Sequence, residues 1–387
     1  LTRNEILDMF TPEEFKLRKI VADLPPYLFT GNITSAGLKK LKGNMYIERI
    51  SYVGLAKGVL DKSVSLINAD DVWSLKINNI NITGLNKTVC VVDSGVNYTH
   101  PDLGGCFGLG CKIIAGDDFV DPLDSDPMDE HGHGTRVSGI ITANGNIKGV
   151  APQSNITAVR VLNQNNEGTI PDIVQGINWC IINRNQYEIK IISISIAITN
   201  QDGNEKIYSS TCDGVDDVVD AANNAKANGI IVLSASGNSG NTSGITSPAC
   251  GSNITSVGAS DDNDITASFS NRAKILDLLS PGVNINTTNR SVSLYQQANG
   301  TSFSTPHVAG VVALMKQANN SLTPAEIENL LKKTGRPVYD SVTKLPFPRV
   351  DALKAVLASY NPLVVTDFRV LNQDGFNTTF EFKIFNA

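Results

Sequence analysis

The sequence predicts an α/β protein: a mainly parallel β-sheet with helices on both faces, in three layers. Short apolar runs rich in β-branched residues, such as 88–92 and 229–234, alternate with helical stretches such as 171–183 and 215–228. Strands of this composition are typical of parallel sheets that are buried on both faces. With 387 residues, of which 41% are hydrophobic, the chain is long enough for one such domain and smaller units at its ends.

Changes in the sequence pattern divide the chain into three regions, 1–62, 63–359 and 360–387. The first reads as a small α+β unit. It has a helix predicted over 13–21, where Thr11, Pro12 and Glu14 form a capping-box pattern, and a strand over 44–50. The last region predicts the start of a β-sandwich-like domain or a hairpin, because 379–384 alternates polar and apolar residues and 363–370 is a candidate partner. A strand that pairs onto the central domain is the alternative.

Predicted strands and helices alternate along the central region. Its strands are predicted at 88–92, 155–161, 190–196, 229–234 and 253–257, and its helices at 135–143, 171–183, 215–228, 302–317 and 324–333. Functional sites of parallel sheets lie at the carboxyl ends of the strands. Asp93 and Asn238 both lie just past such ends, so we expect a site there.

Three segments carry residues that together suit nucleophilic catalysis. Asp93 ends an apolar run, His133 lies in a His-Gly-His-Gly-Thr string, and Ser302 follows Gly300 and Thr301 just before an apolar helix. A serine at a helix N-terminus has backbone N–H groups nearby that favour a developing negative oxygen. The chain order Asp, His, Ser is one of the known orders for a catalytic triad. A simple Ser/Thr helix cap is the alternative for an isolated Gly-Thr-Ser string.

These segments resemble the motifs of the subtilisin family of serine endopeptidases. The resemblance rests on 91–96 with 100–103, on 132–135, on 236–238, and on 300–302 with 306–310, and it covers roughly 63–359. It implies a subtilisin-like fold and peptide-bond hydrolysis through an acyl-enzyme on Ser302, with His133 as base and Asp93 as its partner. It also implies that Asn238, assisted by Thr301, stabilises the oxyanion. His131 is the one rival for the base.

Two other classes of protein stay open as alternatives. A catalytically silent binding module could keep the fold, although the intact motif residues disfavour it. An α/β-hydrolase esterase would need a Gly-x-Ser-x-Gly string and the order Ser, Asp, His, which Ser302 lacks.

The resemblance places substrate between two segments, with Ser195, Ile196 and Ala197 on one side and Ser236 and Gly237 on the other. Substrate would pair there as an extra strand. The family usually has two glycines where Ala197 and Ile198 stand. Side chains at both positions should crowd the pocket, so we expect small or medium apolar P1 residues to be preferred over Phe or Tyr. Arg136 replaces the family's usual histidine.

An acidic segment precedes His133 and suggests a Ca²⁺ site, because carboxylate oxygens are the ligands that Ca²⁺ prefers. The candidate ligands are Asp118, Asp121, Asp124 and Asp126, and Asp117 and Asp129 lie nearby. Asp102 matches a ligand of another calcium site of the family, but the loop 144–148 that would complete that site is short. The alternative is a solvated acidic loop without a metal.

The ends of the chain and its composition suggest how the protein is made. By its position, region 1–62 resembles the family's propeptide, an intramolecular inhibitor and folding chaperone. It carries 10 Lys and Arg against 7 Asp and Glu, whereas the remainder carries 22 against 31, and opposite net charges favour docking. The net charge of −6 argues against nucleic acid as a partner, and no apolar run is long enough for a transmembrane helix.

Cysteines and glycosylation sequons favour a secreted or cell-surface protein. Cys106 and Cys111 flank a short glycine loop that a disulfide could close, and Cys212 and Cys250 both lie in loop-like sequence. Cys90 and Cys180 fall in a predicted strand and helix, where a disulfide and two buried free thiols both stay open. Six cysteines allow 15 pairings. Asn-x-Ser/Thr strings recur along the chain, which suggests a glycoprotein. The N-terminus lacks a signal-peptide core, so we expect a removed signal.

Overall fold

The computed structural model describes residues 7–8, 10–22, 28–41, 62–120, 124–291, 293–360, 363–374 and 377–386. The chain divides into two compact units, Leu1–Gly58 and Val59–Ala387. The strand predicted over 44–50 lies outside the described residues, as does the candidate ligand Asp121. The predicted boundary at 62 lies at the edge of a described range.

The described residues of the first unit include two antiparallel strands and a helix, namely β1 (Phe15–Ala22), β2 (Leu28–Ile33) and α2 (Ser35–Leu41). The helix predicted over 13–21 is therefore wrong. The capping hydrogen bonds do form, since Glu14 N donates to Thr11 Oγ1 (3.3 Å) and Thr11 N donates to Glu14 Oε2 (3.0 Å). They close a single turn, after which main-chain pairing with β2 outweighs the local helix signal.

The second unit is built around a nine-stranded sheet with the order β16-β17-β13-β12-β10-β8-β5-β7-β6. Neighbouring strands run parallel except β16, which is antiparallel to β17. The strands are β5 (Thr88–Asp93), β6 (Ile113–Asp118), β7 (Asn155–Arg160), β8 (Ile189–Ile194), β10 (Ile231–Ala235), β12 (Thr255–Ser260), β13 (Leu278–Pro281), β16 (Arg336–Tyr339) and β17 (Pro346–Arg349). The mainly parallel sheet predicted from the sequence is confirmed.

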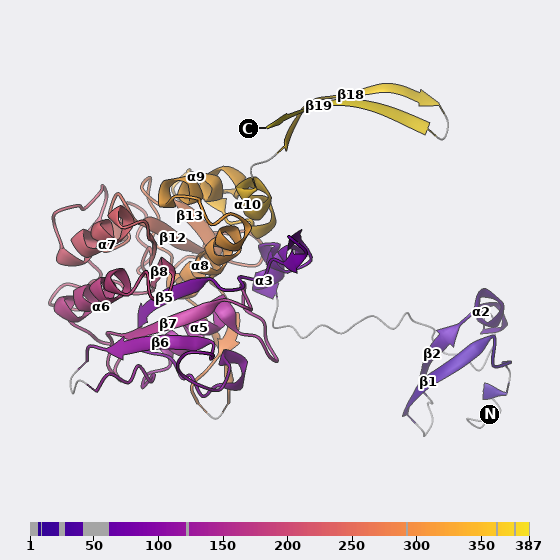
Figure 1. Cartoon of the computed structure of the whole chain (residues 1–387), viewed down its shortest axis with the longest axis horizontal. Coiled ribbons are helices and arrows are strands. Elements are labelled where there is room, and N and C mark those ends of the chain that lie inside the picture. The colour runs from indigo at the N-terminus through magenta and orange to yellow at the C-terminus, as the bar shows by residue number, and fades with distance from the viewer. Residues whose placement is uncertain are drawn as a thin grey trace. The chain divides into compact units, whose positions relative to one another are not determined.

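Helices cover both faces of this sheet, as Figure 1 shows. Strand β5 alternates between two cores: Val89 and Val91 join one hydrophobic cluster, and Cys90 and Val92 join the other. The first cluster contains residues of α5 (His133–Thr142), α8 (Thr301–Ala318), α9 (Pro324–Thr334) and α10 (Ala352–Ser359). The second contains residues of α6 (Ile170–Ile182) and α7 (Asp217–Ala227). The result is the predicted three-layer arrangement.

Short elements complete the second unit. They are α3 (Lys62–Leu66), α4 (Ala69–Val72), β3 (Lys76–Ile77), β4 (Ile80–Asn81), η2 (Pro101–Leu103), β9 (Ile207–Tyr208), β11 (Ile245–Thr246), β14 (Ile285–Thr288) and β15 (Tyr295–Ala298). The strands and helices predicted in the central region are all present within a few residues of their predicted ends. The longer elements β6, β13, β14, β15, β16, β17 and α10, and the shortest ones, were not predicted from the sequence.

Three disulfides pair all six cysteines: Cys90–Cys180, Cys106–Cys111 and Cys212–Cys250. The first joins strand β5 to helix α6 with a Cα–Cα distance of 6.2 Å. The alternative of buried free thiols at Cys90 and Cys180 is therefore wrong.

The C-terminal region, where the start of a β-sandwich-like domain or a hairpin was expected, contains two paired strands. Strand β18 (Leu363–Asp374) runs antiparallel to β19 (Asn377–Asn386), and the register places Leu363 opposite Asn386. Among the described residues, neither strand pairs with the nine-stranded sheet. Residues 375–376, between the two strands, lie outside the described residues.

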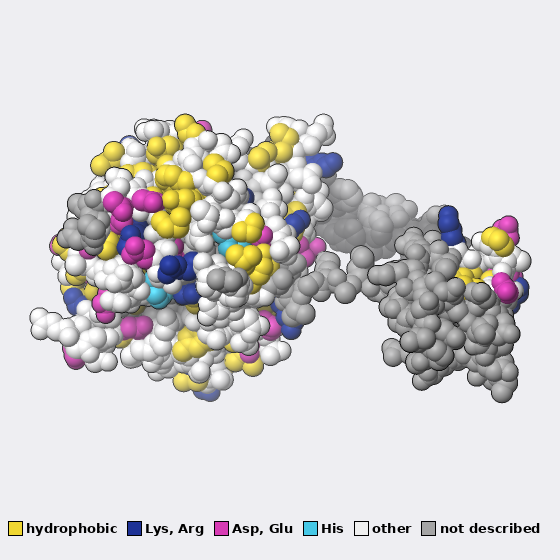
Figure 2. Space-filling model, turned by 90° about the horizontal axis from the view of Figure 1, so that it is seen from below, with side chains coloured by type: hydrophobic (Ala, Val, Ile, Leu, Met, Phe, Trp, Pro, Cys, Tyr) yellow, Lys and Arg dark blue, Asp and Glu magenta, His cyan; other side chains and the backbone are white. Residues whose placement is uncertain are grey.

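The surface carries both signs of charge. On the face shown in Figure 2, acidic and basic side chains of the larger unit lie interspersed rather than in one extended patch. Within the described part of the chain, no helix combines the length and the apolar character that crossing a membrane requires.

Candidate active site

Asp93 and His133 form a buried hydrogen-bonded pair. Asp93 is the last residue of β5, and His133 is the first residue of α5. Asp93 Oδ1 accepts from His133 Nδ1 (2.7 Å) and also from Ser94 N (2.7 Å). Gly134 allows the helix to start this close to β5, because a Cβ there would lie 2.1 Å from Gly95 O. With its Nδ1 proton directed at the carboxylate, the imidazole leaves Nε2 as a proton acceptor.

Asp129 stabilises the turn before His133 by accepting hydrogen bonds from backbone N–H groups. Its carboxylate is buried and accepts from the backbone N–H groups of His131 (3.0 Å), Gly132 (2.6 Å) and Thr135 (2.9 Å). The Ser94 hydroxyl also donates to Asp129 (2.9 Å) and ties this turn to the end of β5. The sequence analysis placed Asp129 in the acidic segment and did not identify this role.

Ser302 lies in the first turn of α8, which starts at Thr301 after Gly300. Gly300 has φ +147°, a backbone conformation that favours glycine. The next side chain, Phe303, has its ring centroid 5.5 Å from that of His133, so the start of α8 lies against the histidine. The Ser302 hydroxyl donates to Ser195 O at 3.2 Å. Hydrogen bonds of a catalytic serine are often long or misaligned until substrate binds.

Asn238 follows β10, and its side chain is oriented by Thr301. The oxygen Oδ1 of Asn238 accepts from Thr301 N (2.8 Å) and from Thr301 Oγ1 (3.0 Å). A backbone N–H can only donate, so the amide oxygen must face Thr301, which leaves the Nδ2 donors of Asn238 for another acceptor. The Thr301 hydroxyl uses its single proton in this contact. Thr301 therefore orients Asn238, which differs from the expected direct assistance to the oxyanion.

The candidate substrate residues form a strand-like segment that continues β8. Ser195 Oγ donates to Ser302 O (2.9 Å), which fixes the segment beside the serine. Among the described residues, the backbone N–H groups of Ile196 and Ala197 have no backbone acceptor, whereas Ile198 N donates to Ser247 O (2.9 Å). On the opposite side, Ser236 is fully buried with its hydroxyl donated to Asn271 O (2.8 Å). Available main-chain groups therefore lie at Ile196 and Ala197.

Ile198 does not crowd a substrate pocket. Its side chain is buried in the same hydrophobic cluster as Ile196, on the side of the sheet that α6 and α7 cover. Residues two apart in an extended segment share a face, so Ala197 points the other way and is only partly buried. The expectation of crowding is therefore wrong for Ile198 and concerns the methyl group of Ala197 alone.

A model of the subtilase family matches residues 84–360 of the chain. The chain belongs to the subtilase family. Serine protease AprX of Bacillus subtilis (strain 168) is 35% identical over 315 residues, which are 71% of this chain and 66% of AprX. Subtilisin BL of Lederbergia lenta is 38% identical over 260 residues, which are 66% of this chain and 86% of that protein. This subtilase thus spans just under two thirds of AprX.

A solved structure agrees with these relatives. The crystal structure of a cold-adapted subtilisin-like serine proteinase matches with a TM-score of 0.59 and 31% identity, over 73% of this chain and 96% of that one. The fold is subtilisin-like, in agreement with the family match.

Glu205 and Asn271 also shape the site of this subtilase, and the sequence analysis missed both. Glu205 Oε1 accepts from Asn238 N (2.6 Å), and Oε2 accepts from Ser239 N (3.2 Å) and Asn271 Nδ2 (2.6 Å). Asn271 N donates to Gly237 O at 3.0 Å. Only glycine fits at 237, because a Cβ there would lie 2.2 Å from Asn271 Nδ2 and 2.6 Å from Glu205 Oε2.

The neighbouring histidine and arginine do not replace His133. The ring of His131 lies 6.4 Å from that of His133, and Asp93 bonds to His133 instead. Burial, and then the nearby His133, lowers the pKa of His131. Arg136 is one turn into α5, and its guanidinium donates to Gln296 Oε1 (3.4 Å). Nothing in the structure explains why arginine stands at 136.

The described carboxylates of the acidic segment form hydrogen bonds within the protein. Asp118 Oδ2 accepts from Arg160 NH1 (2.8 Å), and Asp126 accepts from the Tyr98 hydroxyl (3.0 Å). Asp124 accepts from Asp126 N (2.9 Å). Among the described residues, no three acidic, histidine or cysteine side chains gather as metal ligands, and Asp121 lies outside the described residues. The expected ligand set is therefore not assembled by the described residues.

Asp102, the match to another calcium site of the family, serves a structural role here. Its carboxylate accepts from Asn146 N (3.2 Å), Ile147 N (3.0 Å) and the Tyr295 hydroxyl (3.1 Å). The short loop 144–148 thus provides N–H groups for this carboxylate instead of ligands for a metal.

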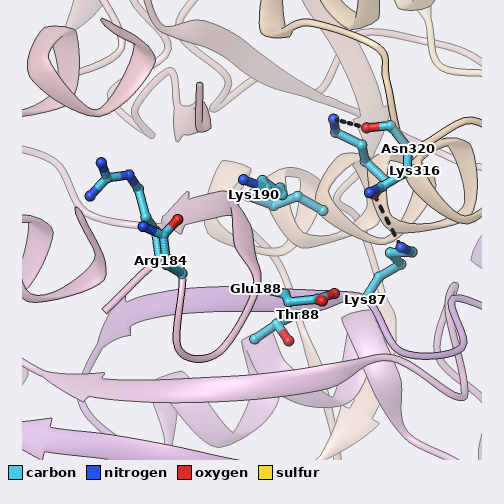
Figure 3. A pocket seen from close by; sticks show the side chains of 9 residues that line it. Lys87, Thr88, Arg184, Glu188, Lys190, Lys316 and Asn320 are labelled. Atoms are coloured by element: carbon cyan, nitrogen blue, oxygen red, sulfur yellow. Dashed lines mark hydrogen bonds between the residues drawn. The ribbon is translucent and has the colours of Figure 1, made fainter. Parts of the chain in front are cut away.

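A separate pocket lies at the other end of the sheet. It has a cavity volume of about 220 Å³ and is lined by Thr88, the first residue of β5, together with Lys87, Glu188, Lys190 and Lys316. Figure 3 shows these side chains around the pocket. Asp93 ends the same strand, so the pocket is a strand's length away from the candidate catalytic residues.

Proposed function

We propose that this subtilase hydrolyses peptide bonds through an acyl-enzyme on Ser302, with His133 as general base and Asp93 as its partner. The observation that carries the proposal is the buried 2.7 Å hydrogen bond from His133 Nδ1 to Asp93 Oδ1, next to the start of the helix that bears Ser302. This bond sets the tautomer of the imidazole and stabilises its charged form.

The chemistry proceeds in two balanced steps. As Ser302 Oγ bonds to the scissile carbonyl carbon, its proton passes to His133 Nε2, and the same proton then goes to the leaving amine nitrogen. Water next attacks the acyl carbonyl carbon and gives a proton to His133 Nε2. The bond from that carbon to Ser302 Oγ then breaks, His133 returns the proton to Ser302 Oγ, and the acid is released. The side chain of Asn238 and the backbone N–H of Ser302 donate to the oxyanion.

Substrate is proposed to bind as an added strand along Ile196 and Ala197. The backbone N–H groups that have no backbone acceptor in this segment support this pairing. The segment also contacts the serine, through the hydrogen bond from Ser302 Oγ to Ser195 O.

We further propose that the enzyme is secreted, or acts at the cell surface, and is made as a proprotein whose residues 1–62 inhibit it. The three disulfides support an oxidising compartment. The separate first unit, with its excess of basic residues, supports the propeptide.

Alanine substitution of the triad tests the catalytic proposal. Ser302→Ala should lower kcat for a peptide p-nitroanilide by about 10⁶-fold, a magnitude measured on another subtilisin, while the melting temperature changes little. Ser304→Ala, two residues along the same helix, is the matched control and should keep activity. Retention of more than about one percent of wild-type cleavage by Ser302→Ala would contradict the proposal and favour a silent binding module.

A further inference from the structure

The loop that carries Asn238 is held by a carboxylate from a different part of the chain. Glu205 accepts from two consecutive backbone N–H groups, those of Asn238 and Ser239, and from the side chain of Asn271. Charge-assisted hydrogen bonds of this kind are roughly twice as strong as neutral ones. Within the described part of the chain, no lysine or arginine pairs with Glu205, so its charge is directed at these three donors.

Glu205 lies on a hairpin that continues the substrate segment. Thr199 pairs antiparallel with Glu205, and Lys206 N donates to Ile198 O (2.9 Å). The hairpin tip is closed by Asn200 N donating to Asn204 O (2.7 Å). Glu205 therefore connects the segment that would pair with substrate to the loop that presents Asn238.

Asn238 is consequently fixed from two sides. Its backbone N–H donates to Glu205 Oε1 (2.6 Å), and its side-chain oxygen accepts from Thr301 at the start of the serine helix. The contact with Thr301 determines the orientation of the Asn238 side-chain amide. The contact with Glu205 fixes the position of the backbone at Asn238. The glycine at 237 is what allows the carboxylate to come this close.

We propose that Glu205 is a positioning residue for catalysis, which acts through Asn238 by holding the oxyanion-binding amide in place. The proposal rests on the proposed oxyanion role of Asn238. A misplacement of about 1 Å in a catalytic group lowers rates by about a hundredfold, so a loosened loop should reduce kcat rather than substrate binding.

A double-mutant cycle tests this in the full-length enzyme, with kcat and KM for a tetrapeptide p-nitroanilide. Glu205→Ala should lower kcat by about ten- to hundredfold and change KM by less than about threefold. In the Asn238→Ala background the same substitution should lower kcat by less than about twofold, since the group it positions is absent. Glu205→Gln, which keeps the size and one acceptor oxygen, should give an intermediate kcat. Glu188→Ala, at the opposite end of the sheet, is the control and should match wild type.

The results distinguish a failure of the positioning role of Glu205 from a failure of the oxyanion role of Asn238. If Asn238→Ala alone lowers kcat by less than about tenfold, the oxyanion role of Asn238 is wrong. If Asn238→Ala is impaired but Glu205→Ala lowers kcat equally in both backgrounds, Glu205 acts independently of Asn238 and the positioning proposal is overturned. Unchanged kcat in Glu205→Ala overturns it as well. Should Glu205→Ala fail to fold, the same cycle with Glu205→Gln decides by the same criterion.

Discussion

His307 lies within the serine helix with its ring fully buried, and Nδ1 forms a 2.7 Å hydrogen bond with Phe303 O. Burial lowers the pKa of His307 from 6.5 to about 4. Between pH 4 and 6.5 the unfolded chain therefore binds a proton that the folded protein excludes. The stability of the fold should fall as pH decreases through this window.

We expect His307→Gln to reduce this pH dependence. Both proteins are measured by urea unfolding in a Ser302→Ala background. Between pH 7 and pH 4, the free energy of unfolding should fall by ~3 kcal/mol more in the protein that keeps His307 than in the His307→Gln variant. The difference between the two slopes matters here, because other groups titrate in both proteins. Parallel curves would show that His307 is not excluded from protonation in the folded state.

Ala197 is the residue at which crowding of the P1 pocket can still be tested, since Ile198 packs into the hydrophobic cluster. Removing one methyl group with Ala197→Gly should raise kcat/KM for a Phe P1 substrate by about fivefold. Activity on an Ala P1 substrate is the matched control and should stay unchanged. An equal change for both substrates would mean that Ala197 does not contact the P1 side chain.

The sequence predicted the candidate triad because each motif residue lies directly beside a strand end or helix start, which local patterns reveal. Glu205 could not be predicted in this way. It follows a polar stretch, Asn200–Asn204, and its role arises only when a hairpin folds back onto a loop more than 30 residues later. Asn271 has the same non-local origin.

At the scale of elements, the buried strands and amphipathic helices of the central sheet were predicted well because their periodicity is local. The helix predicted over 13–21 was wrong because its capping box specifies one turn only, and pairing between β1 and β2 is set by residues farther along the chain. The Cys90–Cys180 disulfide depends on the position of α6 over β5, which spacing alone does not define.

The acidic segment offers a prediction at this scale. Asp118 and Arg160 form a buried ion pair, and Arg160 also pairs with Glu130, so Asp118→Asn should lower the free energy of unfolding by about 1–3 kcal/mol. Because the described carboxylates are bound to protein donors, the loss should be equal in EDTA and in millimolar calcium. The exposed Asp124→Asn is the control and should change little. A loss that appears only with calcium present would indicate that the segment binds the ion after all.

For the whole molecule, region 1–62 and the remainder carry opposite net charge, with 10 basic and 7 acidic residues in 1–62 against 22 and 31 in 63–387. If region 1–62 inhibits the enzyme, their attraction should speed and strengthen binding at low ionic strength. Residues 1–62 added to the processed enzyme should therefore inhibit several-fold more weakly in 0.5 M than in about 0.05 M NaCl, measured as Ki. Salt-independent inhibition would assign the contact to apolar packing, and no inhibition would contradict the propeptide assignment.

If the proposed triad is correct, Ser302 reacts as an activated nucleophile. The most direct measurement is incubation of the active enzyme with a fluorophosphonate probe, followed by mass spectrometry of its peptides. We predict one adduct per chain on the Ser302 hydroxyl, and none in Ser302→Ala or His133→Ala. Absence of any adduct on the wild-type enzyme, or an adduct on a different serine, would contradict the account.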